Sequence, residues 1–350
     1  MQTIRIGQRE IGPGHPAFIV AELSANHGGK LSIAKETVAA AAEAGADAIK
    51  LQTYTADTIT LDCNADAFKI RQGTLWDGRT LHDLYREAYT PWEWQPELKR
   101  HAESLGLLCF SSPFDKTAVD FLERMNVPAY KVASFEITDI PLLEYVAAKG
   151  KPVIISTGIA TEPDVAEAVS ACRKQGNDQI ILLKCTSAYP APLEDANLLT
   201  IPDLSSRFGV ISGFSDHTLG TTAPIAATAL GAKVIEKHFI LDRSIGGPDA
   251  AFSLDRGQFR QMVDAVRDAE KVLGAVSYEL SDKSKRSREF SRSLFVAEDV
   301  RAGDAVTERN VRSVRPGFGM HPRHWPEIVG KRFATAVSRG TPLADEHIAK

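Results

Sequence analysis

Short apolar runs alternate with helix-like segments eight times in this chain, and this alternation limits its possible folds. The runs lie at residues 17–21, 48–52, 107–112, 129–132, 152–156, 180–184, 210–212 and 234–239. Each precedes a helical pattern, from residues 31–44 after the first run to residues 258–273 after the eighth. Strands joined through helices pair in parallel. Eight such units in about 275 residues predict an α/β fold, a (β/α)8 TIM barrel, with a doubly wound open sheet as the alternative.

The chain changes character after residue 273. Residues 276–290 are polar and charged and lack apolar periodicity, which is typical of a linker. Residues 291–350 carry short apolar runs separated by turns, and a module of this size buries little core by itself. We therefore expect a barrel domain at residues 1–280, a linker at residues 281–290 and a small module at residues 291–350 that docks onto a partner surface.

Composition excludes several classes of protein. The 350 residues are 43% hydrophobic and carry a formal net charge of -4, so a broad basic face for nucleic acid is not expected. The N-terminal residues form no apolar targeting segment, and no stretch approaches the length of a membrane span. The four cysteines are scattered without a CxxC pair, as in reduced proteins. We expect a cytoplasmic protein that has neither nucleic acid nor a membrane as a partner.

Two short motifs follow or end consecutive strands of the predicted barrel. They are Ser215-Asp216-His217-Thr218 and Glu236-Lys237-His238-Phe239. If these strands are parallel neighbours, both imidazoles lie on one rim, close enough to share a metal ion. Two neutral histidines leave most coordination positions open, as in a Lewis-acid catalyst. The alternative is that both are packed or hydrogen-bonded core histidines.

Other polar residues fall at the carboxyl ends of the strands, where the side chains of such a barrel point into the active site. They are Glu22, Lys50, Gln52, Ser112, Lys131, Ser134, Glu136, Ser156, Lys184, Ser187, Tyr189 and Ser215, with Asp249 in the loop after the last strand. Lys50 and Lys131 interrupt apolar strands, where an unpaired ammonium group would be unstable without an anion. Tyr189 either contacts substrate or packs on Pro190, and Asp249 is a candidate partner of the metal site.

The ordered motifs of this chain resemble those of the sialic acid synthase family. The resemblance covers nearly the whole chain, and its motifs are residues 21–27, 50–54, 111–115, 131–136, 215–218 and 236–239. The C-terminal module, with Arg315-Pro316-Gly317, is similar to the antifreeze-like (SAF, β-clip) domain of that family. Residues 75–81 and 89–94 most resemble the branch of the family that forms pseudaminic acid. Ser187 stands where relatives that form N-acetylneuraminate typically carry asparagine.

The resemblance implies a condensation of phosphoenolpyruvate with 2,4-diacetamido-2,4,6-trideoxy-altropyranose that releases phosphate. A divalent metal (Mn²⁺, Co²⁺ or Mg²⁺) on His217 and His238 would polarise the sugar aldehyde. Lys50 and Lys131 suit the charge of phosphoenolpyruvate. Hydrogen bonds to it would come from Ser112, Ser134, Ser156 and Ser215. We expect Glu136 to handle the attacking water, Glu22 to bind sugar protons and Asp249 to orient a metal-bound water.

The resemblance also implies a homodimer with exchanged domains, in which Arg315 of one chain contacts an N-acetyl group in the site of the other. A surface arginine in a turn is the simpler alternative. Sister enzymes that act on N-acetylmannosamine or on 2,4-diacetamido-2,4,6-trideoxymannose would share the same rim. A metal-dependent aldolase using free pyruvate, or an inactive carbohydrate-binding scaffold, are the more distant alternatives.

Overall fold

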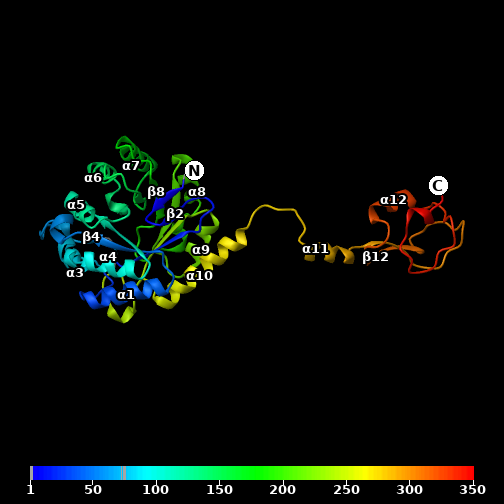
Figure 1. The fold of residues 1–350 in the computed structure, drawn as a ribbon, viewed down its shortest axis with the longest axis horizontal. Coiled ribbons are helices and arrows are strands. Elements are labelled where there is room, and N and C mark those ends of the chain that lie inside the picture. The colour runs from blue at the N-terminus through cyan, green and yellow to red at the C-terminus, as the bar shows by residue number, and fades with distance from the viewer. Residues whose placement is uncertain (1–2, 72, 74–75) are drawn as a thin grey trace. The chain divides into compact units, whose positions relative to one another are not determined.

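The computed structural model describes residues 3–71, 73 and 76–350. Leu75, which opens one of the motif segments named above, lies outside the described residues. The chain divides into two compact units, Met1–Gly274 and Ala275–Lys350 (Figure 1). Each unit is described by itself below.

In the described part of the first unit, eight parallel strands close into a barrel, which confirms the predicted TIM-like fold. Their order around the ring is β10-β3-β4-β5-β6-β7-β8-β9. The strands are β3 (Phe18–Glu22), β4 (Ala48–Thr53), β5 (Leu108–Pro113), β6 (Tyr130–Val132), β7 (Val153–Ser156), β8 (Ile180–Cys185), β9 (Ile211–Asp216) and β10 (Val234–His238). Each of the eight apolar runs seen in the sequence therefore forms one strand.

The α-helices surround this barrel. They are α1 (Leu31–Glu43), α2 (Ala56–Ile59), α3 (Leu81–Ala88), α4 (Gln95–Ser104), α5 (Lys116–Arg124), α6 (Ile140–Ala147), α7 (Glu162–Lys174), α8 (Thr200–Phe208), α9 (Thr222–Ala229) and α10 (Arg256–Leu273). Short 3-10 turns are η1 (Asp66–Phe68), η2 (Trp92–Trp94), η3 (Ser134–Glu136), η4 (Leu193–Ala196) and η5 (Arg243–Ile245). The motif segment of residues 89–94 ends in η2, and α4 follows directly from Gln95.

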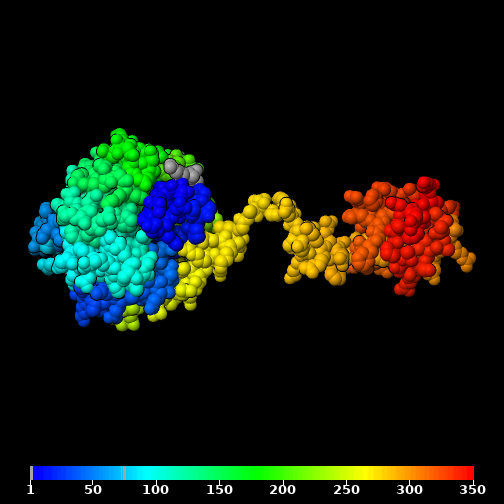
Figure 2. Space-filling model, in the orientation of Figure 1, coloured from blue at the N-terminus to red at the C-terminus, as the bar shows by residue number. Residues whose placement is uncertain are grey.

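A hairpin of β1 (Ile4–Ile6) and β2 (Arg9–Ile11) precedes the barrel and was not expected from the sequence. A side chain added at Gly7 would lie 2.6 Å from Leu108, and one at Gly12 would lie 3.6 Å from Ile211. These two residues begin β5 and β9, so the hairpin covers the amino-terminal end of the barrel. Figure 2 shows this N-terminal segment in blue on the surface of the barrel unit. Substrates must therefore enter from the carboxyl end.

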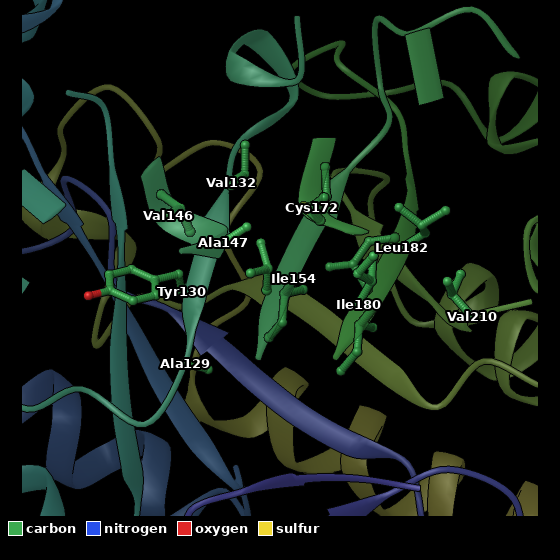
Figure 3. Packing of buried hydrophobic residues seen from close by; sticks show 14 of the residues in the cluster. Ala129, Tyr130, Val132, Val146, Ala147, Ile154, Cys172, Ile180, Leu182 and Val210 are labelled. Atoms are coloured by element: carbon green, nitrogen blue, oxygen red, sulfur yellow. The ribbon is translucent and has the colours of Figure 1, made fainter. Parts of the chain in front are cut away.

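The barrel core is apolar at the amino ends of its strands and polar at their carboxyl ends. Along β3, Phe18 and Val20 belong to the main apolar cluster, whereas Glu22, two residues further on the same face, is polar. Figure 3 shows how side chains of β6, β7 and β8 pack with those of α6 and α7 in this cluster. A second cluster joins the outer face of β3, β4 and β10 to α1, α4 and α10. The polar layer is therefore held on a rigid scaffold.

The second unit has a small core of its own. Its elements are α11 (Asp282–Ser287), η6 (Arg288–Phe290), β11 (Ser293–Val296), β12 (Val311–Val314), η7 (Pro322–His324), α12 (Trp325–Ile328) and η8 (Asp345–His347). Strands β11 and β12 pair antiparallel, and Leu294, Val311 and Phe333 are among the buried residues. The segment that the sequence suggested as a linker thus carries the short helix α11. In the described residues of either unit, no helix has the length and apolarity to cross a membrane.

Candidate active site

His217 and His238 lie on one rim of the barrel, at the ends of neighbouring strands. Strand β9 pairs with β10 in a register that sets Ser215 opposite Glu236, two residues before each histidine. The two imidazole centroids are 5.1 Å apart. Both side chains are buried, at 7% and 9% exposure. The structure therefore brings together the two residues that the sequence motifs suggested as metal ligands.

The Nδ1 atoms of the two imidazoles have different surroundings. His217 Nδ1 lies 2.8 Å from the carbonyl oxygen of Thr186 and 3.8 Å from Cys185 Sγ. His238 Nδ1 lies 3.8 Å from Asp249 Oδ2 and has no hydrogen-bond partner among the described residues. Burial lowers the pKa of His238 well below its usual value, with the charge of His217 acting in the same direction. A neutral ring is the form that binds a metal ion.

Burial and the neighbouring groups shift the pKa of His217 in opposite directions. Burial lowers its pKa, but the neighbouring Cys185 outweighs burial, and the pKa is raised. A divalent cation nearby would oppose protonation of either ring. Among the described residues, no group of three or more His, Cys, Asp or Glu side chains gathers as a ready-made metal cage. The donor set thus fits an ion held by two imidazoles, with its other positions open.

Four buried charges form a network beside the histidines. Lys50 pairs with Glu22 and lies 3.5 Å from Glu236 Oε1, and Lys131 Nζ lies 3.5 Å from the same oxygen. All four side chains are at most 6% exposed. Glu236 was not proposed as a site residue from the sequence. Strand periodicity could have revealed it, because Glu236 and His238 are two residues apart and so share one face of β10.

The two ammonium groups respond differently to this network, because burial lowers the pKa of Lys131 although Glu236 opposes the fall. Burial disfavours the charged form of Lys50, but Glu22 and Glu236 outweigh it and raise its pKa. Burial likewise raises the pKa of Glu236, yet Lys131 and Lys50 together hold it below its usual value. Burial dominates at Glu22, whose pKa is raised despite Lys50. The result is a compact cluster of two ammonium and two carboxyl groups, in which the lysines can exchange a carboxylate partner for an anionic ligand.

The rim serines surround this cluster. Ser112 Oγ lies 3.5 Å from Lys50 Nζ, and Ser215 donates to Glu236 over 2.9 Å. Ser134 Oγ accepts a hydrogen bond from the Gly158 backbone over 3.1 Å. Ser156 Oγ is buried without a hydrogen-bond partner among the described residues. Because native proteins rarely leave buried polar atoms unpaired, such an atom indicates a ligand contact.

The absence of a side chain at Gly158 leaves room for the hydroxyl groups of Ser134 and Ser187. A Cβ atom at this position would lie 2.1 Å from Ser187 Oγ, 2.8 Å from Ser134 Oγ and 3.3 Å from Cys185 Sγ. Both serine hydroxyls therefore approach the backbone of the loop after β7. Serine at position 187 suits this narrow space, whereas a longer side chain would need a different arrangement.

The remaining candidates of the barrel unit also lie at the carboxyl end. Gln52 donates to Ser24 over 3.0 Å and to Glu22 over 3.4 Å. The Tyr189 ring lies 4.6 Å from that of His217. Glu136, in η3, has a buried Oε2 atom without a hydrogen-bond partner among the described residues. Lys184 bonds the carbonyl of Cys185, over 3.1 Å, so its ammonium group is not part of the charge network described above.

Asp249 and Arg315 complete the set of candidates. Asp249 is buried at 9% exposure, and the backbone of Ala25 donates to it over 3.4 Å. Arg315 belongs to the second unit, where it is exposed in the segment that follows β12.

A second buried ion pair lies on the opposite face of the same two strands. Asp216 and Lys237 pair with each other, and both side chains are fully buried. Lys237 also donates to the carbonyl of Thr218, and Asp216 Oδ1 accepts from the Thr218 backbone over 2.8 Å. These contacts fix the chain on both sides of His217. The sequence motifs contained this pair, but its role depends on strand register.

Comparisons with known proteins match both parts of the chain. The model of the NeuB family matches residues 37–278, and that of the SAF domain matches residues 291–349. The chain is 48% identical to pseudaminic acid synthase of Helicobacter pylori, covering 96% of this chain and 98% of that protein. It is 37% identical to N,N'-diacetyllegionaminic acid synthase of Legionella pneumophila, over 98% of this chain and 97% of that protein.

A solved structure also matches. It is the N-acetylneuraminic acid (sialic acid) synthetase of Leptospira borgpetersenii in complex with citrate, with a TM-score of 0.73 and 32% identity. The match covers 82% of this chain and 95% of that one. The resemblance seen in the sequence motifs is therefore confirmed for both parts of the chain. This chain belongs to the NeuB family and carries a C-terminal SAF domain.

Proposed function

We propose that this protein condenses phosphoenolpyruvate with 2,4-diacetamido-2,4,6-trideoxy-altropyranose, giving pseudaminic acid and phosphate. The 48% identity to pseudaminic acid synthase of Helicobacter pylori over nearly the whole chain supports this choice of sugar. The observation that carries the chemistry is the meeting of two buried lysines with two buried histidines at one barrel mouth. An anionic enol ester and an aldehyde need these two kinds of group.

Lys50 and Lys131 are the groups we assign to phosphoenolpyruvate. Their ammonium groups share Glu236 and would turn to the phosphate and carboxylate of the substrate. Ser112, Ser134, Ser156 and Ser215 would add hydrogen bonds to the same anion. The unpaired hydroxyl of Ser156 supports this assignment.

His217 and His238 are the residues that would hold a divalent ion, with Mn²⁺, Co²⁺ or Mg²⁺ as candidates. When bound there, such an ion supplies Lewis-acid polarisation of the sugar aldehyde. Asp249, 3.8 Å from His238 Nδ1, would orient that ring and nearby water. Gln52 and Tyr189 line the same mouth and would contact the sugar.

The bonds that form and break in this reaction suggest roles for Glu136 and Glu22. C3 of phosphoenolpyruvate forms a bond to the aldehyde carbon, positive charge develops at C2, and water adds there before phosphate leaves. Glu136 would accept the proton of that water, and Glu22 would bind a sugar hydroxyl or its ring-opening proton. Burial raises the pKa of Glu136 to about 7, although Lys131 opposes the rise. A base with this pKa suits proton transfer near neutral pH.

A phosphate-release assay tests the proposed function. Phosphoenolpyruvate is supplied with the altro sugar, with N-acetylmannosamine or with 2,4-diacetamido-2,4,6-trideoxymannose, each with and without a chelator. We expect phosphate and a nonulosonate with the altro sugar, and loss of both after chelation. Faster turnover of another sugar would transfer the assignment to a sister enzyme. Product formed from free pyruvate would indicate an aldolase, and no turnover at all would contradict the proposal.

Glu136→Gln is expected to lower kcat/KM about 10²-fold and to remove its rise with pH through about 7, since only the ionised carboxylate accepts a proton. The sign follows from the raised pKa, because the carboxyl group stays protonated below about 7. The charged or titratable groups around it are Lys131, Lys50, Asp139 and Tyr85. The measurement is kcat/KM against pH, with Glu167→Gln as the control, because Glu167 is an exposed residue of α7. Unchanged turnover in Glu136→Gln would remove this residue from the water step.

We also propose that the SAF domain of a second copy completes the site in a homodimer with exchanged domains. Exposed apolar residues on consecutive loops around the mouth support a covered rim: Phe135, Ile159, Leu193 and Leu219. In the SAF domain, Phe318 is 65% exposed close to Arg315. Arg315 would then contact an N-acetyl group of the sugar.

Co-expression of Arg315→Ala with His238→Ala tests this sharing of sites. Each variant alone is expected to have little activity. In a mixed dimer, one of the two sites would combine an intact barrel with an intact Arg315, so purified mixed dimers should recover about half of the wild-type activity. The measurement is phosphate release by purified mixed dimers carrying two different tags. Mixed dimers as inactive as the parents would show that each chain uses its own Arg315.

A further inference from the structure

Trp76, in the segment between β4 and α3, lies near a residue from the far side of the barrel mouth. In the closed ring, β4 and β8 are separated by three strands on either side, so they stand opposite each other. Trp76 belongs to the loop after β4, yet its ring lies 5.8 Å from that of Tyr189, which follows β8. This contact therefore spans the opening through which substrates must enter.

The loop is held in this position by its own hydrogen bonds and by α3. Ile70 donates to the carbonyl of Arg79 over 2.9 Å, and Gly78, at φ +89°, donates back to Ile70 over 2.9 Å. Arg79 pairs with Glu87 of α3 over 2.7 Å and bonds the carbonyl of Asp83 over 3.1 Å. These contacts hold the backbone on both sides of Trp76.

Trp76 continues a series of rings that ends at the histidines. The Tyr189 ring lies 5.4 Å from that of Phe252, and Phe252 lies 4.9 Å from His238. We call Trp76, Tyr189 and Phe252 the aromatic wall. If the sugar aldehyde lies at the two imidazoles, its distal carbons extend along this wall towards Trp76. An apolar wall favours apolar substituents at that end of the sugar.

We propose that Trp76 determines sugar specificity by holding the C6 methyl and acetamido methyl groups of a diacetamido-trideoxy sugar against the aromatic wall. The inference rests on the proposed function, because it places the aldehyde at the histidines. At this wall, the hydroxyl of a C6 hydroxymethyl group would lose its hydrogen bonds to water, and the ring faces offer no polar group to replace them. The wall thus distinguishes the deoxy sugar from N-acetylmannosamine.

The variants Trp76→Ala and Trp76→Phe test this role, with Leu61→Ala as the control. Leu61 belongs to the same loop, is 64% exposed and has no place in the aromatic wall. One readout is kcat/KM for the altro sugar and for N-acetylmannosamine at saturating phosphoenolpyruvate. The other is calorimetric binding of the two reduced sugars, which cannot react, in the absence of phosphoenolpyruvate.

We expect Trp76→Ala to weaken binding of the reduced diacetamido sugar about tenfold and to lower the preference for it over N-acetylmannosamine by a similar factor. Trp76→Phe should retain part of the preference, and the KM for phosphoenolpyruvate should not change. An equal loss for both sugars, or no loss, would overturn the inference. Absence of phosphate release in the wild type would instead refute the proposed function, and the binding titrations would still decide whether Trp76 selects the deoxy sugar.

Discussion

His238→Ala is expected to lose divalent metal and to turn over about 10³-fold more slowly than the wild type, since Lewis-acid activation supplies several kcal/mol. The two imidazoles are the ligands we propose for this ion, and their centroids are 5.1 Å apart. Burial keeps His238 neutral, with a pKa well below the usual value, so it is poised to donate an electron pair. With one ring left, a chelating site becomes a single weak contact. His217→Ala should behave in the same way.

The measurement is metal content after dialysis, together with calorimetric titration of Mn²⁺ into metal-free protein. Both report binding without relying on turnover. His15→Ala is the control, because His15 lies beside the N-terminal hairpin, at the other end of the barrel, next to Glu10. If both site variants bound metal as tightly as His15→Ala, the two histidines would not be its ligands.

Strand number and strand ends could be predicted from this sequence because they depend on local patterns. Each apolar run became one barrel strand, and polar residues such as Lys50 and His238 came to lie at the carboxyl ends. Parallel strands separated by helices leave little freedom in where these ends meet. The metal-binding proposal thus followed from the positions of two motifs alone.

Contacts across strands could not be predicted in the same way. Glu236 bridges two lysines only because of the register between distant strands, which a single sequence does not specify. The N-terminal hairpin was missed because its two strands have three residues each, too short for a clear periodic signal. Trp76 belongs to the motif of residues 75–81, but its contact with Tyr189 depends on the path of a long loop. Most of the features that we did not predict are therefore contacts between residues far apart in the chain.

Lys237→Met is expected to destabilise the barrel by about 3–5 kcal/mol, because it leaves Asp216 as an uncompensated buried charge. The lysine also loses its bond to the Thr218 carbonyl, which becomes a second unpaired buried group. The measurement is the free energy of unfolding from urea denaturation followed by circular dichroism. Lys35→Met is the matched control, since Lys35 pairs with Glu97 in an exposed ion pair. Such exposed pairs contribute about 1 kcal/mol or less.

A double variant separates stability from the positioning of His217. Asp216→Asn combined with Lys237→Met removes both charges, and the asparagine oxygen can still accept the Thr218 N–H. We expect most of the lost stability to return, as when buried ion pairs are replaced by neutral groups of similar size. Affinity for Mn²⁺ should stay reduced, because the Thr218 carbonyl no longer has a lysine donor to hold the chain that carries His217. If Lys237→Met lowered the free energy of unfolding no more than Lys35→Met does, the buried pair would not stabilise the barrel. If the double variant bound Mn²⁺ like the wild type, the pair would not position the metal site.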